Sequence, residues 1–338
     1  MSSIPSHVPA PSTKRFNGLM GFRGKGYRVR IVSFLYEHFV KLVHLADRVG
    51  GPIALAVIIF FYFILDLRHR WYDYPRFVRL HNLRSPGFWK GTSAFRHYFR
   101  MIWYWHLSCG AILAYPRLGL PYWKKRFKIS GTPPQALPEL GTRPVVLASM
   151  HVGAFALIPY WLRSLGISAA TIVGGLPIIL DNAEVWKARA RGNLLYGLQD
   201  VPLTFERRGP AVRAAFRFLK PGHILCMAID GGKLSIEHDA YDAGGFAYYA
   251  KQGAARIAAQ TNAILIPVTV NNVGLLRFDV RFGAPVPDEL LQKEDFRAAT
   301  QHLVTELWKA NRERPDDLAW TSIESYAPEL RGRRPGWP

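Results

Sequence analysis

The sequence predicts an α/β domain with a mixed, mostly parallel sheet flanked by helices and preceded by a hydrophobic, membrane-associating helix. Two observations predict the domain. From residue 145 onward, short runs rich in Val, Ile and Leu alternate with helical patterns, as is typical of βαβ units. Gly and Pro stand between these runs and separate the elements. A third observation, an uncharged apolar run over residues 53–65, predicts the helix that precedes the domain.

Composition favours a folded chain with an anionic partner. Of the 338 residues, 49% are apolar or aromatic, which is enough to bury a large core. The 44 Lys and Arg against 24 Asp and Glu give a formal charge of +20. This excess predicts binding to phospholipid headgroups, an acidic carrier or nucleic acid. We divide the chain into a flexible basic arm (1–30), a membrane-associating helical region (31–130), an α/β domain (131–325) and a basic tail (326–338).

The N-terminal regions indicate contact with a membrane. The arm has no acidic residue and no apolar segment followed by a small-residue cleavage site, so we do not expect a cleaved signal peptide. Residues 29–45 show helical spacing of apolar residues. The apolar run 53–65 rises only about 20 Å as a helix, against a hydrocarbon core of roughly 30 Å. The run could therefore form a helix that spans the bilayer, a helix that is half inserted into it, or a helix buried in the protein core.

A basic and aromatic segment follows the apolar run. It contains Arg68, Arg70, Trp71, Tyr72, Tyr74, Arg76 and Arg79. Such a mixture suits the level of lipid headgroups, and it also suits stacking on single-stranded RNA. The adjacent apolar run favours lipid, so we expect a membrane phospholipid partner and no nucleic acid.

Strands and helices then alternate in the α/β domain. Strands are expected at 145–149, 169–173, 201–205, 224–229 and 263–270, and 275–282 is expected to return antiparallel across the turn 271–274. Helices are expected at 95–114, 154–165, 182–198, 211–220, 250–260 and 288–311.

His151 is the first candidate for a catalytic base. It follows the predicted strand 145–149, and reactive groups of open α/β sheets gather beyond the carboxyl ends of strands. A histidine that only finishes a strand and bonds to a carbonyl is the alternative.

Several segments together resemble the late acyltransferases of lipid A biosynthesis and their relatives in the lysophospholipid acyltransferase superfamily. The resemblance runs from about residue 34 to 320. Its parts, in the family's order, are the apolar helix, His81-Asn82-Leu83-Arg84, the helix 95–113, His151-Val152-Gly153, Phe205-Glu206-Arg207-Arg208-Gly209, Leu219-Lys220-Pro221-Gly222, Ile229-Asp230-Gly231, Ile266-Pro267-Val268 and Arg314-Pro315-Asp316-Asp317-Leu318-Ala319-Trp320. The ordered set carries the resemblance, because no single part is specific.

The resemblance implies a histidine base that a carboxylate orients in a His-x4-Asp/Glu motif. Here the carboxylate position holds Ala156. Asp230 and Glu206 are the candidates to replace the missing acid, since each follows a predicted strand and parallel strands place both at the edge where His151 lies. We favour Asp230, because the glycines after it allow a close turn. The alternative for Asp230 is a turn cap.

The same resemblance implies a set of substrate contacts. Arg207 and Arg208 are expected to hold a phosphate or the phosphopantetheine arm of a carrier, unless they form an exposed basic loop. Gly153 and Gly231, beside the candidate base and acid, are expected to let backbone approach the substrate. No cofactor is expected beyond the acyl thioester, which is a co-substrate. No metal is expected either, because Cys109 and Cys226 lack the spacing of a metal site.

The function we expect is a membrane-associated acyltransferase at the cytoplasmic face of the inner membrane. It would move a fatty acyl group from acyl carrier protein or acyl-CoA to a hydroxyl or amine of a lipid-like acceptor, with His151 as general base and without the usual motif acid. A catalytically degenerate protein of the same fold, which binds lipid or acyl carrier, is the alternative. An RNA-binding protein is a third reading that rests on charge and aromatic residues alone.

Overall fold

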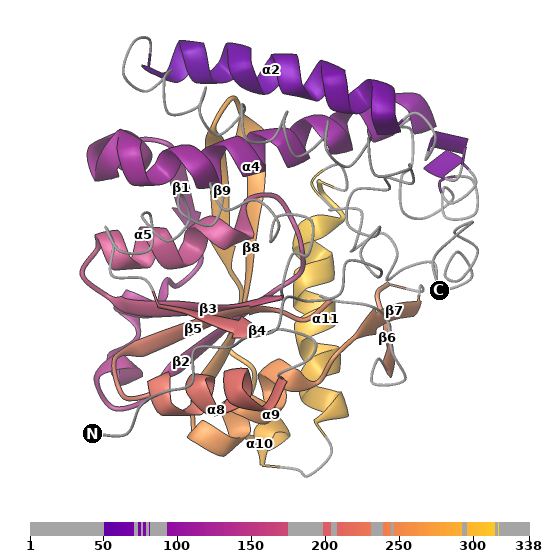
Figure 1. The fold of residues 1–338 in the computed structure, drawn as a ribbon. Coiled ribbons are helices and arrows are strands. Elements are labelled where there is room, and N and C mark those ends of the chain that lie inside the picture. The colour runs from indigo at the N-terminus through magenta and orange to yellow at the C-terminus, as the bar shows by residue number, and fades with distance from the viewer. Residues whose placement is uncertain are drawn as a thin grey trace, which may run out of the picture.

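The computed structural model shows an α/β fold with a seven-stranded sheet between layers of helices (Figure 1). It describes residues 51–70, 74–75, 77–78, 81, 93–174, 199–203, 208–230, 239–244, 247–292, 296–314 and 317. The expected basic arm, the helix at 29–45, the helix at 182–198 and the basic tail lie outside these residues.

The sheet contains β1 (Phe127–Ser130), β2 (Val145–Ser149), β3 (Ser168–Gly174), β4 (Gln199–Leu203), β5 (His223–Ala228), β8 (Ile264–Gly274) and β9 (Arg277–Phe282). Their order is β1-β9-β8-β2-β5-β3-β4, and every neighbouring pair is parallel except the antiparallel pair β8 and β9. The mixed, mostly parallel sheet predicted from the sequence is therefore confirmed.

Strand β2 lies in the middle of the sheet, and its sequence explains why. All five residues of Val145–Ser149 are buried, as is usual for a parallel strand covered on both faces. Val146 and Ala148 pack into the cluster that contains side chains of α9 and α11. Val145 and Leu147 pack into the opposite cluster, with side chains of α5. Alternate side chains of one strand thus anchor two helical layers.

The helices of the domain are α5 (Ile158–Ser164), α8 (Arg208–Phe218), α9 (Gly253–Thr261), α10 (Asp288–Leu291) and α11 (Arg297–Asn311). Short 3-10 helices occur at η2 (Pro134–Ala136), η3 (Pro138–Gly141) and η4 (Phe155–Leu157). A separate hairpin is formed by β6 (Asp239–Asp242) and β7 (Ala247–Ala250).

Several expected elements differ in detail from those observed, and the helix expected at 95–114 continues to Lys124. The single helix expected at 154–165 is a 3-10 turn followed by α5. The helix expected at 288–311 is divided into α10 and α11. The turn expected at 271–274 belongs to β8, and the chain reverses at residues 275–276 instead, where Leu276 has a φ of 52°.

Two long helices lie over one side of the domain (Figure 1). They are α2 (Gly51–Arg70) and α4 (Ala94–Lys124), and they pack against each other. Phe63 of α2 is buried against α4, with its ring centroid 4.7 Å from that of Phe99 and 5.2 Å from that of Trp103. Contacts between aromatic rings therefore join the two helices.

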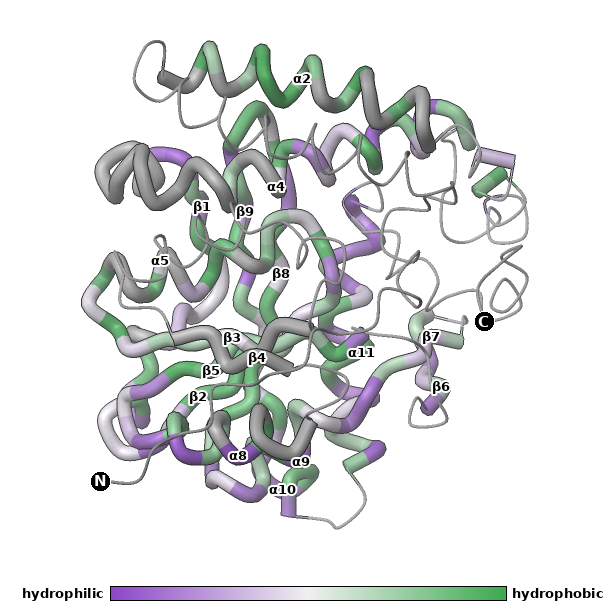
Figure 2. Tube along the Cα trace, viewed as in Figure 1, coloured by the Kyte–Doolittle hydropathy of each residue, from purple (hydrophilic) through white to green (hydrophobic). Residues whose placement is uncertain are grey.

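The outer face of α2 is apolar and exposed. Figure 2 shows hydrophobic residues along this helix at the surface of the molecule. The face consists of Ile53, Val57, Phe60, Phe61 and Ile64, whose exposed fractions run from 45% to 78%. Their spacing of three and four residues places them on one stripe of the helix. Among the described residues, no helix combines the length and hydropathy needed to cross a bilayer.

Candidate active site

His151 and Asp230 lie at the carboxyl ends of two adjacent strands. Strands β2 and β5 are parallel, and Ser149 is aligned with Ala228 in their register. His151 follows the first strand by two residues and Asp230 follows the second by two, so both emerge at the same edge of the sheet. Oδ1 of Asp230 is 2.7 Å from Nδ1 of His151. Asp230, the carboxylate favoured from the sequence, thus lies against the histidine ring, whereas Glu206 is outside the described residues.

Asp230 is a buried carboxylate with several hydrogen-bond donors. Its side chain is fully buried, while that of His151 is 27% exposed. The backbone N–H of His151 donates to both carboxylate oxygens at 3.0 Å. The hydroxyl of Tyr248 donates to Oδ2 at 2.9 Å. Hydrogen bonds that donate to a carboxylate favour its charged form, so we assign Asp230 as an acceptor of all these bonds.

This assignment fixes the tautomer of His151. Because the carboxylate accepts, Nδ1 of the imidazole carries the proton and donates it to Asp230. Nε2 then carries the lone pair and is the nitrogen that can take a proton. The Phe155 ring packs edge to face against the imidazole, with 5.0 Å between the ring centroids. Asp230 and Phe155 together hold the ring in one orientation.

A tight turn at Gly153 places His151 relative to the sheet. Gly153 has a φ of 50°, and a Cβ at this position would lie 1.9 Å from the carbonyl oxygen of Val270 on β8. Glycine is the residue that adopts this conformation without steric cost. The backbone N–H of Gly153 donates to the carbonyl of Asp317 at 2.8 Å. The expected close backbone approach at Gly153 is thus an approach to β8, and nothing described tests its expected contact with a substrate.

The backbone N–H groups of the turn are engaged within the protein. Those of residues 151 to 155 donate, in order, to Asp230, Met150, Asp317, Val270 and Val152. A turn of this kind can otherwise supply the donors that stabilise an oxyanion. The N–H groups of residues 151–155 are therefore not available to an oxyanion.

Asp317 fixes the turn from the far end of the chain. Its carboxylate accepts from the backbone N–H and from the side-chain amide of Asn272, both at 2.8 Å. The Asn272 amide also donates to Ser108 on α4 at 3.3 Å, and Arg314 donates to the Asn272 carbonyl at 3.1 Å. Sequence reasoning assigned Asp317 no role. The residue does lie in the segment 314–320, which is one of the segments that carry the resemblance, and this was the feature of the sequence that could have drawn attention to it.

Several other predicted site residues lie outside the described part of the chain. Glu206, Arg207 and Gly231 are among them. Arg208 begins α8, but its side chain is not described. Ala156, where the resemblance implies a carboxylate, lies in η4. The acid that contacts the histidine therefore comes from the neighbouring strand and not from the turn that follows His151.

No metal centre is formed by the described residues, which contain no group of three or more His, Cys, Asp or Glu side chains that could hold an ion. Cys226 is a free thiol buried on β5. Burial raises the pKa of this thiol above its ordinary value, so it stays protonated and is a poor metal ligand.

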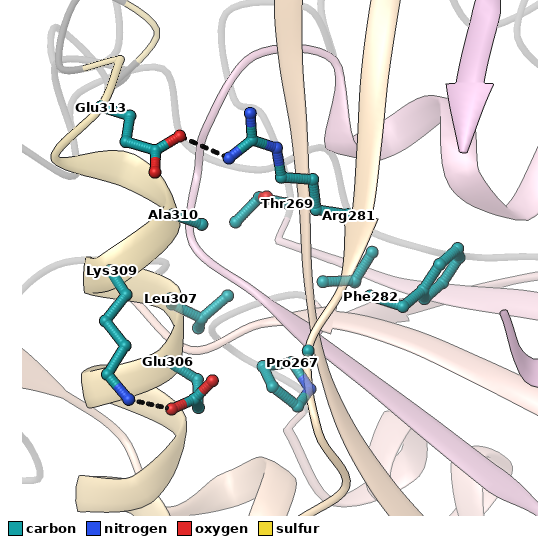
Figure 3. Close-up of a pocket in the computed structure, with 11 residues that line it drawn as sticks. Pro267, Thr269, Arg281, Phe282, Glu306, Leu307, Lys309, Ala310 and Glu313 are labelled. Atoms are coloured by element: carbon teal, nitrogen blue, oxygen red, sulfur yellow. Dashed lines mark hydrogen bonds and ion pairs between the residues drawn. The ribbon is translucent and has the colours of Figure 1, made fainter. Parts of the chain in front are cut away.

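A cavity of 220 Å³ lies away from the His151–Asp230 pair, between α11 and strands β8 and β9 (Figure 3). Figure 3 shows Arg281 reaching toward Glu313 and Lys309 toward Glu306 around this space, with separations of 2.5 Å and 2.6 Å. The guanidinium of Arg281 donates hydrogen bonds to Glu313 and Asp279, and these bonds raise its pKa. The charges at the rim thus pair with one another, and neither His151 nor Asp230 lines the cavity.

Comparison with known proteins adds no relative: no family model matches the chain, and no curated protein has a significantly similar sequence.

Proposed function

We propose that the protein is a membrane-associated acyltransferase. It moves a fatty acyl group from acyl carrier protein or acyl-CoA to a hydroxyl or amine of a lipid-like acceptor, such as a lipid A precursor, and His151 is the general base. One observation carries the proposal: Asp230 lies 2.7 Å from Nδ1 of His151. This contact supplies the carboxylate partner that Ala156 cannot provide. His151 therefore has a carboxylate that can orient it as the general base of acyl transfer.

The proposed reaction follows from the tautomer of His151. Nε2 takes the proton of the acceptor hydroxyl or amine while the oxygen or nitrogen attacks the thioester carbonyl. An ester or amide bond forms, the carbon–sulfur bond breaks, and the leaving thiolate takes the proton back from the imidazolium. Asp230 stabilises that imidazolium and keeps the ring in orientation. The hydrogen-bond donor for the oxyanion is assigned to a segment outside residues 151–155.

Membrane association is supported by the outer face of α2 and by the charge of the chain. Five apolar side chains on one stripe can insert between lipids at the level of the headgroups. A formal charge of +20 favours an anionic bilayer surface and an acidic carrier. We place the protein at the cytoplasmic face of the inner membrane, where acyl thioesters are available, and assign phosphate binding to Arg207 and Arg208.

A second candidate is a protein of the same fold that binds lipid or acyl carrier without turnover. The engaged N–H groups of residues 151–155 favour it, because an oxyanion finds no donor there. The two candidates differ in one outcome, since only the enzyme consumes the thioester.

The experiment is a thiol-release assay with purified protein, acyl carrier thioester and anionic vesicles that contain candidate acceptors. We expect wild-type protein to release thiol and His151→Ala to lose roughly 10²- to 10⁴-fold in rate, as for loss of a general base. His223→Ala is the matched control, since His223 lies at the amino end of β5, at the opposite edge of the sheet, where Nδ1 lies 2.6 Å from the carbonyl of Phe218. Equal rates for wild type and His151→Ala would contradict the role of His151.

The acceptor is identified by comparing the lipids of cells with and without the gene by mass spectrometry. The proposal predicts that one lipid loses a fatty acyl group when the gene is absent, and the mass difference gives the chain length. An unchanged lipid profile, together with no thiol release from any acceptor, would favour the binding protein.

A further inference from the structure

We infer that Tyr248 is a positioning residue, which fixes the carboxylate of Asp230 so that it can orient His151. The inference rests on the proposed function where it concerns rate. Tyr248 lies on β7 and is fully buried. Its hydroxyl donates to Oδ2 of Asp230 at 2.9 Å, while Oδ1 lies 2.7 Å from the histidine ring. The two carboxylate oxygens thus have different side-chain partners. Tyr248 binds Oδ2, and the His151 ring lies against Oδ1.

The chemistry of the carboxylate explains why this contact matters. A carboxylate on a short side chain rotates about its last bond, and rotation would carry Oδ1 away from Nδ1 of His151. The backbone N–H of His151 is shared between both oxygens at 3.0 Å, so it does not distinguish one oxygen from the other. Tyr248 does distinguish them, because its hydroxyl reaches Oδ2. A buried hydrogen bond to a charged group is also among the stronger ones in proteins.

The β6–β7 hairpin is built to hold this hydroxyl in place. The backbone N–H of Lys251, just after β7, donates to the carbonyl of Ile229, the residue before Asp230, at 2.9 Å. Tyr248 is paired across the hairpin with Tyr241, and the guanidinium of Arg297 on α11 lies 5.4 Å from the Tyr241 ring centroid. The hairpin is thus tied both to the end of β5 and to α11.

A hydrogen bond at the base of the hairpin also holds it in place. Gln252 donates to Asp239 at 2.7 Å and so connects β6 with the start of α9. The Tyr241 hydroxyl lies 3.4 Å from the same carboxylate, within β6 itself, and is too distant to add much to this connection. The tyrosine on β7 therefore approaches Asp230 from a braced element, as a group that positions another side chain has to do.

The test compares Tyr248→Phe with Tyr241→Phe. Both variants remove one hydroxyl from the same hairpin, but only the first removes a donor to Asp230. The first readout is the low-field proton NMR signal of the His151 Nδ1–H, recorded without substrate and assigned by its loss in His151→Gln. We expect the signal to be sharp in wild type and in Tyr241→Phe, and broadened or lost in Tyr248→Phe. The same signal in all three proteins would overturn the inference.

The second readout is the rate of acyl transfer. We expect Tyr248→Phe to lower kcat about tenfold with KM unchanged, as for the loss of one hydrogen bond to a charged group, and Tyr241→Phe to leave both constants unchanged. A rise in KM alone would also overturn the positioning role. The NMR signal needs no substrate, so it tests the positioning role independently of the proposed function. If Tyr248→Phe changes the signal but wild type transfers no acyl group, the proposed function is refuted and the positioning role is supported.

Discussion

The edge of the sheet at His151 and the outer face of α2 differ in the kind of contact that they make. At the edge, a few specific contacts fix one imidazole ring. Asp230 lies against the ring, Tyr248 donates to Asp230, and the turn at Gly153 positions the backbone. On α2, five apolar side chains form a stripe that is largely exposed. Orientation of a base requires fixed geometry, whereas contact with a lipid surface depends on apolar area. Single substitutions should therefore have large effects at the edge and graded effects on α2.

The largest effect is expected from Gly153→Ala, which tests the rigidity of the edge. The new Cβ would lie 1.9 Å from the Val270 carbonyl at a φ of 50°, so the turn has to move. We expect a loss of about 3 kcal/mol in the free energy of unfolding, together with loss of acyl transfer, as measured by urea denaturation and thiol release. Gly166→Ala is the control, because Gly166 also has a positive φ but has nothing near its Cβ position. Equal stability of the two variants would contradict the proposed constraint.

Asp230→Asn tests the orientation of the base. An amide cannot accept hydrogen bonds at both side-chain positions, so the imidazole loses its fixed tautomer. We expect a drop in kcat of at least tenfold, about 1.4 kcal/mol or more of barrier, in the thiol-release assay. Asp242→Asn is the matched control, since Asp242 is exposed at the end of β6. A full rate for Asp230→Asn would mean that the carboxylate has no part in the reaction.

The double change Ile53→Ser and Val57→Ser tests the face of α2. These side chains are 78% and 63% exposed, so their loss should not disturb the core. We expect roughly thirtyfold weaker binding to anionic vesicles, since each of the two apolar side chains contributes about 1 kcal/mol on transfer to lipid. Vesicle co-sedimentation measures the change. Leu165→Ser changes a side chain that is 40% exposed in the turn after α5. It should leave binding unaltered, and an equal loss in that variant would refute a specific role for α2.

The smallest effect is expected at the surface pair of Arg143 and Asp288. Two hydrogen bonds of 2.9 Å join them and lower the pKa of Asp288. A lowered pKa stabilises the fold above the ordinary pKa of the acid, and this contribution is lost as the pH falls through the lowered value. Because Asp288 is 52% exposed, we expect Arg143→Gln to cost less than about 1 kcal/mol at pH 7. Urea unfolding at pH 7 and at pH 3 should show a smaller cost at the lower pH. A cost that does not change with pH would contradict this account.

The sequence was informative where local pattern and tertiary structure agree. The run from Val145 to Ser149 is apolar throughout and ends at the histidine, and it is the observed β2. Choosing Asp230 as a partner for His151 required only that two buried strands be parallel neighbours. Both conclusions depend on strand burial and strand order, which an apolar run and the alternation of elements can indicate.

The sequence was less informative where a distant residue decides the local structure. Asn271 and Asn272 precede Val273 and Gly274 and read as a turn, yet they continue β8 because Asp317 accepts from the Asn272 backbone and side chain. Tyr248 lies in a four-residue strand, and its partner is 18 residues away. No local pattern indicates that this hydroxyl reaches Asp230, because the contact exists only once the hairpin packs on the end of β5.

In the proposed reaction, His151, held by Asp230, removes a proton from a lipid acceptor. A single-turnover measurement tests it most directly, with enzyme in excess over acyl carrier thioester on vesicles that contain the acceptor. It compares wild type with His151→Gln, which keeps a polar side chain without the base. We predict that wild type transfers the acyl group to the acceptor and that His151→Gln binds the vesicles equally but transfers it at least a hundredfold more slowly. Transfer at the wild-type rate by His151→Gln would show that His151 is not the base.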